Sequence, residues 1–242
     1  MAGAAVWRGA RVVGVLEETA RVRTIVLEVP GWPGHSAGQH VDLRLTAEDG
    51  YQTERSYSIA SAPEDARLAL TVERIDGGEV SAYLTRELGV GDELELRGPL
   101  GGYFTWRTRD GGPLLLIAHG PGVVPLMAML RHRAANASTV DARLLVSSRS
   151  PAHVFHRDEL AILAKGAGLV VHHTFTDPSA GGRPARAVDA QALRTVGPAP
   201  TRHPRIFVSG PTGFVGRTAD LLVELGHERT TIRVQDFGAI AA

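Results

Sequence analysis

The run Leu114-Leu115-Leu116-Ile117-Ala118 constrains the fold more than any other segment, because its five apolar residues follow one another without a polar break. A strand of this kind must be buried on both faces, as in a parallel sheet that helices cover on both sides. Four further β-prone runs follow it, at residues 143–147, 169–174, 205–209 and 231–234. Helix-like patterns lie between them, at about residues 123–133, 156–165, 189–196 and 212–225. This alternation predicts an α/β domain with a doubly wound parallel sheet.

The first part of the chain has six short β-prone runs, at residues 11–16, 22–29, 40–45, 51–59, 68–72 and 93–96. One amphipathic helix is predicted at about residues 80–88, where Leu84 and Leu88 lie one turn apart. Six such strands predict an antiparallel six-stranded β-barrel. A polar linker with Gly and Pro occupies residues 108–113. We therefore predict two domains, residues 1–110 and residues 111–242.

The composition excludes several classes of function. With 26 basic and 26 acidic residues, the chain has no net charge, which argues against an extended basic surface for nucleic acid. It contains no cysteine, which excludes disulfides, thiolate zinc sites and cysteine-ligated iron–sulfur clusters. The pairs His153/His156 and His172/His173 have metal-like spacing but lack a carboxylate cluster, so we predict no metal site. Since no segment approaches the roughly 20 apolar residues of a membrane span, we predict a cytoplasmic protein without membrane contact.

The segment Arg55-Ser56-Tyr57-Ser58 lies within a predicted strand of the barrel. Because side chains alternate along a strand, Arg55 and Tyr57 point to the same face. A flavin cofactor needs a cation for its phosphate, an aromatic plane beside its ring system and a small donor near its reactive nitrogen. Arg55, Tyr57 and Ser58 supply these three groups. Taken alone, the segment is also consistent with a half-buried strand tyrosine and a surface arginine.

Two glycine-containing turns precede predicted helices. Gly77-Gly78-Glu79-Val80-Ser81 leads into the helix of the barrel, where backbone N–H groups and Ser81 form a candidate phosphate site. His119-Gly120-Pro121-Gly122-Val123-Val124-Pro125 follows the apolar strand, and its glycines let the backbone approach a pyrophosphate. The alternative for this second turn is a tight strand-to-helix connection with Pro125 in the first helical turn.

Further candidate residues follow the other parallel strands at their carboxyl ends, where doubly wound folds bind ligands. Ser147-Ser148-Arg149 ends the second strand, and Arg183 and Arg186 follow the third. Ser209-Gly210-Pro211 ends the fourth strand, and Phe237 follows the fifth. An arginine here would favour a ribose 2′-phosphate, although Arg183 and Arg186 are also consistent with exposed loop arginines. Phe237 could cover a flavin or close the core at the C-terminus.

Taken in this order, the segments resemble the ferredoxin–NADP reductase superfamily over essentially the whole chain. The motifs that carry the resemblance are Arg55-Ser56-Tyr57-Ser58, Gly77-Gly78-Glu79-Val80-Ser81, Gly120-Pro121-Gly122-Val123-Val124-Pro125, and Ser209-Gly210-Pro211 with Phe237-Gly238. The resemblance implies a flavin-binding barrel followed by a pyridine-nucleotide domain, with FAD favoured over FMN and with NADPH or NADH as reductant. The chain looks most like the stand-alone bacterial oxidoreductases whose relatives pass electrons to oxygenases.

The resemblance also implies roles for individual residues. FAD contacts are implied for Arg55, Tyr57, Ser58, Ile59, Val72, Arg74, Gly78, Val80 and Ser81. Nicotinamide-nucleotide contacts are implied for Gly120, Gly122, Pro125, Ser148, Arg149, Gly210, Pro211 and Phe237. Arg55 would hold the flavin phosphate, Tyr57 would pack on the isoalloxazine, and Ser58 would lie near its N5. Hydride would pass from nicotinamide C4 to flavin N5, with Tyr57, Ser58 and Ser209 at the reaction centre and no proton donor required.

Three positions differ from the family pattern. Pro121 stands where a threonine or serine is usual, which alters the space for nicotinamide, and Ser209 stands where cysteine is common. Asp177 stands where an arginine is usual, and its carboxylate would repel a 2′-phosphate. The choice between NADPH and NADH therefore stays open at the level of sequence.

We predict an FAD-dependent NAD(P)H oxidoreductase that passes electrons to a separate acceptor, which could be a ferredoxin, an oxygenase or a small molecule. The alternative is a repurposed FAD-binding protein whose NAD(P)H half-reaction is altered or lost, and the departures at Pro121 and Asp177 motivate it. A third hypothesis is a reductase that releases reduced flavin as a product. It predicts loose binding of FAD.

Overall fold

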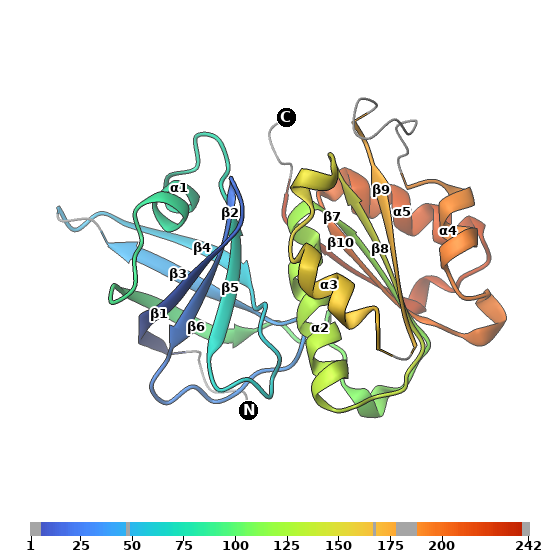
Figure 1. The fold of residues 1–242 in the computed structure, drawn as a ribbon, viewed down its shortest axis with the longest axis horizontal. Coiled ribbons are helices and arrows are strands. Elements are labelled where there is room, and N and C mark those ends of the chain that lie inside the picture. The colour runs from blue at the N-terminus through green and yellow to red at the C-terminus, as the bar shows by residue number, and fades with distance from the viewer. Residues whose placement is uncertain (1–5, 47–48, 167, 178–187, 239–242) are drawn as a thin grey trace.

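The computed structural model describes residues 6–46, 49–166, 168–177 and 188–238. The chain forms two lobes, a β-barrel from its first part and a helix-covered sheet from its second (Figure 1). Within the described ranges, no helix combines the length and apolar character that crossing a bilayer requires.

The barrel is one six-stranded antiparallel sheet in the order β4-β3-β6-β1-β2-β5. Its strands are β1 (Trp7–Thr19), β2 (Val22–Glu28), β3 (His40–Thr46), β4 (Gln52–Ser58), β5 (Leu68–Glu73) and β6 (Glu93–Leu100). Helix α1 (Glu79–Arg86) packs Val80 and Leu84 into the barrel core. The edge strands β4 and β5 share no ladder, and only an isolated bridge between Ile59 and Leu70 joins the two edges. The barrel is therefore open along this line.

The second lobe is a five-stranded parallel sheet in the order β11-β10-β7-β8-β9. Its strands are β7 (Leu114–His119), β8 (Ala142–Ser148), β9 (Leu169–Phe175), β10 (Arg205–Gly210) and β11 (Ile232–Asp236). Its helices are α2 (Val123–Ala135), α3 (Arg157–Leu163), α4 (Ala190–Val196) and α5 (Thr212–Glu224). The doubly wound sheet and the antiparallel barrel predicted from the sequence are both confirmed.

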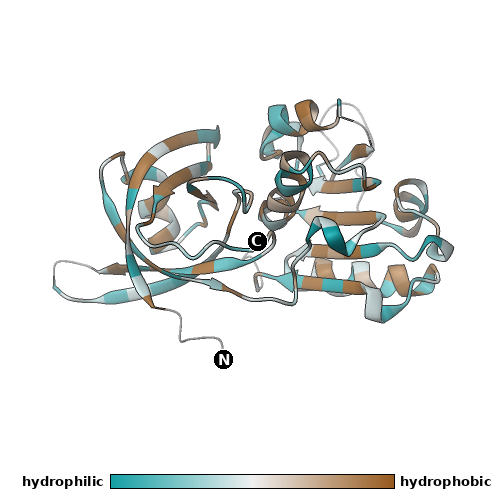
Figure 2. Cartoon of the chain, turned by 90° about the horizontal axis from the view of Figure 1, so that it is seen from below, coloured by the Kyte–Doolittle hydropathy of each residue, from teal (hydrophilic) through white to brown (hydrophobic). Residues whose placement is uncertain are grey.

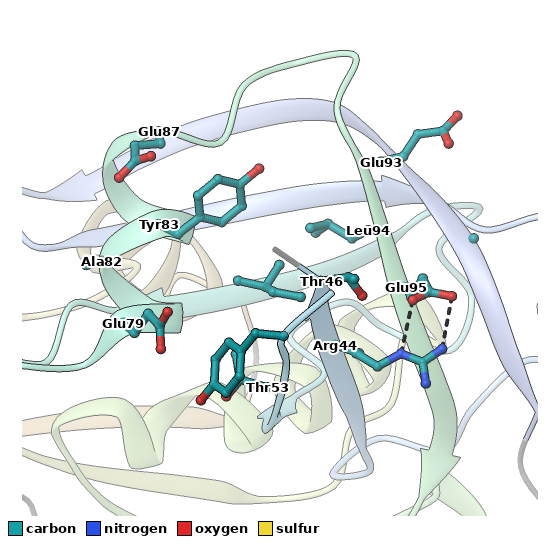
Figure 3. Close-up of a pocket in the computed structure, with 13 residues that line it drawn as sticks. Arg44, Thr46, Thr53, Glu79, Ala82, Tyr83, Glu87, Glu93, Leu94 and Glu95 are labelled. Atoms are coloured by element: carbon teal, nitrogen blue, oxygen red, sulfur yellow. Dashed lines mark hydrogen bonds and ion pairs between the residues drawn. The ribbon is translucent and has the colours of Figure 1, made fainter. Parts of the chain in front are cut away.

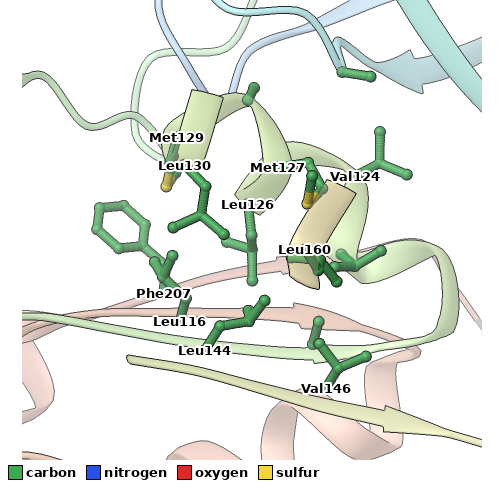
Figure 4. Packing of buried hydrophobic residues seen from close by; sticks show 14 of the residues in the cluster. Leu116, Val124, Leu126, Met127, Met129, Leu130, Leu144, Val146, Leu160 and Phe207 are labelled. Atoms are coloured by element: carbon green, nitrogen blue, oxygen red, sulfur yellow. The ribbon is translucent and has the colours of Figure 1, made fainter. Parts of the chain in front are cut away.

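Alternate residues of β7 pack on opposite faces of the parallel sheet. Leu114, Leu116 and Ala118 belong to the core cluster under α2 and α3 (Figure 4). Leu115 and Ile117 belong to the cluster that α4 and α5 cover. Figure 2 shows the resulting hydrophobic bands along the central strands, between the helices. An uninterrupted apolar strand is thus explained by helices on both faces.

Residues 101–113 connect the two sheets and help to join the lobes. Phe104 and Trp106 in this connection are buried in the core cluster of the second lobe, and the Phe104 ring meets the Phe207 ring edge-on at 5.3 Å. We propose a domain boundary between residues 110 and 111, directly before the cis peptide Gly112-Pro113 and β7.

Each predicted strand and helix corresponds to an observed element, and the main differences lie at the ends. Strand β1 begins at Trp7 and runs to Thr19, well beyond the predicted residues 11–16. It pairs with β6 over its first residues and with β2 later, with register shifts at Val12/Gly14 and Glu17/Thr19. Such irregularities let one long strand bend around a barrel, and the local apolar pattern does not report them.

Candidate functional site

Strand β4 presents Arg55 and Tyr57 on one face, as predicted. In the β3–β4 ladder, Arg55 lies opposite Leu43 and Tyr57 lies opposite Val41. Tyr57 packs against the barrel core, and burial raises the pKa of its hydroxyl to about 12. The Arg55 guanidinium is exposed and bonds only with its own strand, through Nη1 to Thr53 Oγ1 at 3.2 Å and to the Glu54 carbonyl at 2.7 Å. It is thus available to an anion at the open edge of the barrel.

Across the opening, β5 and α1 supply groups that suit a phosphate. Arg74 directly follows β5, and its buried Nε has no hydrogen-bond partner among the described residues. The first N–H groups of α1, as at any helix N-terminus, have no intrahelical partner. No described side chain caps them at Gly78. The Ser81 hydroxyl is already engaged, because it accepts from the Ile75 N–H and donates to the Gly78 carbonyl, each at 3.1 Å. Phosphate contact would therefore come from the helix N–H groups and not from Ser81.

These observations fit the flavin and diphosphate parts of FAD. Arg55 and Arg74 provide cations on the two borders of the opening, and the start of α1 provides backbone donors. Tyr57 provides an aromatic surface, while Ile59 and Val72 are fully buried beside it in the barrel core. The unpartnered Arg74 Nε is the kind of group that a bound oxygen atom would satisfy.

A cavity of about 970 Å³ lies between α1 and the hairpin of β3 and β4 (Figure 3). Thr53 lines it two residues before Arg55, and Tyr83 lines it from α1. In its wall, Arg44 donates two hydrogen bonds of 3.0 Å to Glu95. Its carboxylates are Glu79, Glu87, Glu93 and Glu95. Because this lining is acidic, a phosphate would sit at the arginines and not in the cavity.

The turn after β7 brings the backbone close to the neighbouring strand β10. Gly120 has a φ of +52°, and residues 120–122 form a single 3₁₀ turn before α2. A Cβ at Gly122 would lie 2.1 Å from the Ser209 carbonyl oxygen, so this position accepts only glycine without displacing the backbone. Pro125 is buried in the first turn of α2. The two strands that meet here, β7 and β10, are neighbours at which the sheet order reverses, which is where doubly wound folds bind nucleotides.

His119 fills part of this crevice. Its Nδ1 lies 3.2 Å from Ser147 Oγ, and its ring centroid lies 5.3 Å from that of Phe214 at the start of α5. Burial lowers the pKa of His119, which favours the neutral imidazole. His119 therefore places an uncharged ring between the ends of β7 and β8 and the start of α5.

The other predicted nucleotide residues gather at the same edge of the sheet. Ser209 is fully buried, and its Oγ has no hydrogen-bond partner in the described part of the chain. Gly210 and Pro211 lead directly into α5, and the Phe237 N–H donates to the Gly210 carbonyl at 3.3 Å. Phe237 itself is 39% exposed, so it does not close the core.

The ends of β8 and β9 place a cation beside a carboxylate. Ser148 is buried, and the exposed Arg149 that follows has its Nε 4.0 Å from Asp177 Oδ2. Arg183 and Arg186 lie outside the described residues. The described part of this edge thus offers an adenosine ribose both a carboxylate and a guanidinium.

Gln235 joins the two candidate sites, and sequence reasoning missed it. Its Nε2 donates to Ser58 Oγ at 3.2 Å, across 177 positions of the sequence, and Ser58 is buried. In the β10–β11 ladder, Gln235 lies opposite Ser209. The end of β4, the strand with the predicted flavin motif, therefore meets the carboxyl edge of the parallel sheet beside Ser209. The C-terminal segment pointed only to Phe237 and Gly238, because a lone polar residue at the end of a strand carries no distinctive signal in the sequence.

No group of three or more metal-ligand side chains occurs among the residues that the structure describes. His153 bonds to Ser150 within its own loop, whereas His156 contacts the barrel.

Comparison with known proteins identifies the family. Residues 16–105 match the family model of the oxidoreductase FAD-binding domain. The chain is 34% identical to ferredoxin–NADP reductase B of Sorangium cellulosum, over 83% of this chain and 84% of that protein. It is 31% identical to the glycine betaine monooxygenase reductase subunit of Chromohalobacter salexigens, over 96% of this chain and 64% of that protein. It spans 61% to 64% of the length of three such relatives, which include a Chromobacterium violaceum flavohemoprotein.

Solved structures share the fold over nearly the whole chain. The FAD/NAD-binding domain of nitric oxide dioxygenase from Vibrio cholerae superposes with a TM-score of 0.85 at 24% identity, covering 96% of this chain and 98% of that one. A ferredoxin–NADP⁺ reductase of Neisseria gonorrhoeae gives a TM-score of 0.81 at 20% identity, covering 95% and 98%. With a barrel that matches the oxidoreductase FAD-binding domain and the related reductases as its relatives, the chain belongs to the ferredoxin–NADP reductase superfamily.

Proposed function

We propose that the protein is an FAD-dependent NAD(P)H oxidoreductase that passes electrons from a nicotinamide through the flavin to a separate acceptor. The contact between Ser58 and Gln235 is the observation that carries this proposal. It sets the strand of the flavin motif against the sheet edge that holds Ser209 and the glycine turn, so that a flavin and a nicotinamide bound at these motifs would be neighbours.

FAD, when bound, accepts a hydride and releases its electrons to an acceptor. Arg55 and Arg74 bind its phosphates together with the start of α1, and Tyr57 supports the ring system. Ser58, fixed by Gln235, offers a hydroxyl at the border of the two lobes. Gly120 and Gly122 would allow the nucleotide to approach the backbone, and the buried Ser209 Oγ beside them has no hydrogen-bond partner among the described residues. The contribution of these residues is alignment and exclusion of water, not proton transfer.

The names of the relatives suggest the kind of acceptor. They include reductase components of glycine betaine monooxygenase and of propane 2-monooxygenase, and a ferredoxin–NADP reductase. We therefore propose that the acceptor is a separate oxygenase or ferredoxin, or else a small molecule.

The test is an anaerobic titration of the purified FAD-loaded protein with NADPH and then with NADH, following the flavin absorption band. Rapid bleaching by either nucleotide is the expected result. Retention of FAD without bleaching would overturn the proposal and favour the repurposed flavoprotein. Loss of the flavin in gel filtration, with activity restored by added FAD, would instead favour a reductase that releases reduced flavin.

Asp177 is expected to make NADH the preferred reductant. Its carboxylate can accept a hydrogen bond from a free ribose 2′-hydroxyl, and its charge repels a 2′-phosphate. We expect Asp177→Asn to raise the ratio of kcat/KM for NADPH to that for NADH by about tenfold, which corresponds to about 1.4 kcal/mol. Steady-state kinetics with both nucleotides measures the ratio. The control is Asp158→Asn, at an exposed position of α3. An unchanged ratio in Asp177→Asn would remove Asp177 from the specificity site.

Gln235→Ala is expected to slow flavin reduction without loosening FAD. The substitution removes one neutral hydrogen bond to Ser58, a contact worth about 1 kcal/mol, so we expect the limiting reduction rate to fall about fivefold. Anaerobic stopped-flow at saturating nucleotide measures the rate, and fluorescence titration measures FAD affinity. Gln52→Ala, at the exposed far end of β4, is the control. Equal rates in wild type and Gln235→Ala would show that Ser58 needs no support from β11.

A further inference from the structure

His156 of the second lobe is inserted into the wall of the barrel. It precedes α3, is only 4% exposed, and has a φ of +52°, in the left-handed region that residues with a Cβ rarely adopt. A backbone of this kind costs about 1 kcal/mol or more, so the contacts of the side chain must hold it in place.

The His156 ring contacts two strands of the barrel. Its Nδ1 lies 3.0 Å from Glu18 Oε1 on β1, and its Nε2 lies 3.1 Å from Thr71 Oγ1 on β5. Its backbone N–H donates to Glu18 Oε2 at 3.2 Å. Thr24 on β2 links the two partners, because its hydroxyl donates to Glu18 at 2.8 Å and lies 2.9 Å from Thr71 Oγ1. The four side chains form a closed ring of hydrogen bonds.

The hydrogen-bond donors and acceptors around this ring determine the protonation state of His156. Glu18 accepts hydrogen bonds from the His156 backbone N–H and from the Thr24 hydroxyl, and as a carboxylate it can only accept. Nδ1 of His156 must therefore donate to Glu18. Since the Thr24 proton is used on Glu18, the Thr71 proton is the one that bridges the two hydroxyls. Thr71 must then accept from Nε2, and both ring nitrogens of His156 carry a proton.

Arg131 on α2 makes a second contact with the barrel, beside the contact of His156. Its Nη1 donates to the Ala60 carbonyl, and its Nε and Nη2 hold both carboxylate oxygens of Glu159 on α3. Its Nη2 lies 3.4 Å from His156 Nδ1, and Glu159 Oε2 lies 3.9 Å from the same atom. Two cations and two carboxylates thus balance in this partly buried cluster, which includes Glu18.

The contacts of His156 and Arg131 lie on the borders of the flavin opening, the gap between β4 and β5 where we propose that FAD binds. Thr71 directly precedes Val72, and Ala60 follows Ser58 by two residues. We propose that His156, held as an imidazolium between Glu18 and Thr71, is a positioning residue that, together with Arg131, fixes the nucleotide-binding lobe against the two borders of the flavin opening. This inference rests on the proposed function, since it is hydride transfer that requires the alignment. A shift of about 1 Å between reacting groups can cost about 100-fold in rate.

The protonation state can be tested without any turnover. Nitrogen-15 NMR of the FAD-loaded protein, with labelled histidine, should show one histidine with both ring nitrogens protonated. The signal should be absent from His156→Ala. If the assigned His156 carries a proton on one nitrogen only, the proposal is overturned.

The positioning role can be tested by kinetics. We expect His156→Ala to lower the limiting rate of flavin reduction at least about tenfold, with the dissociation constants for FAD and nucleotide changed less than about twofold. His153→Ala, in the same loop but bonded only to Ser150, is the matched control and should behave as wild type. A rate in His156→Ala within twofold of wild type would refute the role.

A second pair of variants keeps the test decisive if His156→Ala does not fold. Thr71→Ser retains the hydroxyl that receives Nε2, whereas Thr71→Val has a similar volume and lacks it. We expect slow flavin reduction in Thr71→Val and a near-normal rate in Thr71→Ser, and equal rates in both would contradict the proposal. If neither nucleotide reduces even the wild-type flavin, the proposed function fails as a whole, and the NMR signal still reports whether the imidazolium forms.

Discussion

Replacing Gly122 by alanine is expected to destabilise the protein by about 3 kcal/mol and to abolish reduction of the flavin by a nicotinamide. The φ of Gly122 is −57°, so alanine meets no conformational strain and the effect is purely steric. A Cβ would lie 2.1 Å from the Ser209 carbonyl oxygen and 2.9 Å from the Gly210 nitrogen. All of these are backbone atoms, which cannot rotate away, so the turn must separate from β10. The nucleotide crevice would then lose its shape.

The control for this substitution is Gly216→Ala on the exposed face of α5. A Cβ at Gly216 meets nothing within 4 Å, and alanine inside a helix is favoured over glycine by up to about 1 kcal/mol. Thermal unfolding of both variants measures stability, and stopped-flow with NADH measures the reaction. A Gly122→Ala protein with the stability and reduction rate of wild type would show that the close approach of the turn to β10 is not required.

The fold was predictable because its signals are local. The apolar run in β7 indicated a strand covered on both faces, and glycine turns marked the places where strands meet helices. The flavin motif on β4 was predictable for the same reason, because alternation along a strand places Arg55 and Tyr57 together without knowledge of any other segment.

The parts that were missed depend on contacts between distant segments. Gln235 lies 177 positions from Ser58, and His156 lies 85 positions from Thr71, so no local pattern pairs them. Ser81 was predicted to contact a phosphate, and the structure differs from this prediction for a related reason. The sequence places its hydroxyl at the start of α1, but only the loop conformation shows that the Ile75 N–H and the Gly78 carbonyl already occupy it.

These distant contacts join the lobes at two places, in addition to the His132–Glu64 contact and the packing of Phe104 and Trp106. Gln235 bonds to Ser58 at the end of β4, and His156 and Arg131 bond to Thr71 and the Ala60 carbonyl. Two separate attachments restrict rotation more than one does, so the flavin strands and the nucleotide edge should move as one body. Because the proposed FAD contacts all lie in the barrel, FAD affinity should depend on barrel residues.

Arg55→Ala is accordingly expected to weaken FAD binding by about 10- to 100-fold while leaving the fold intact. A hydrogen bond to a charged group is worth about 1.5–3 kcal/mol. Arg55 makes no ion pair with any described residue, so its loss removes only two exposed hydrogen bonds within β4 from the described contacts. Arg55→Lys should fall between the two, because lysine keeps the charge but not the planar fork. Fluorescence titration of the apoprotein with FAD measures the affinity, with Arg86→Ala, an exposed arginine in the last turn of α1, as control. Unchanged affinity in Arg55→Ala would assign the phosphate to Arg74 and the start of α1 alone.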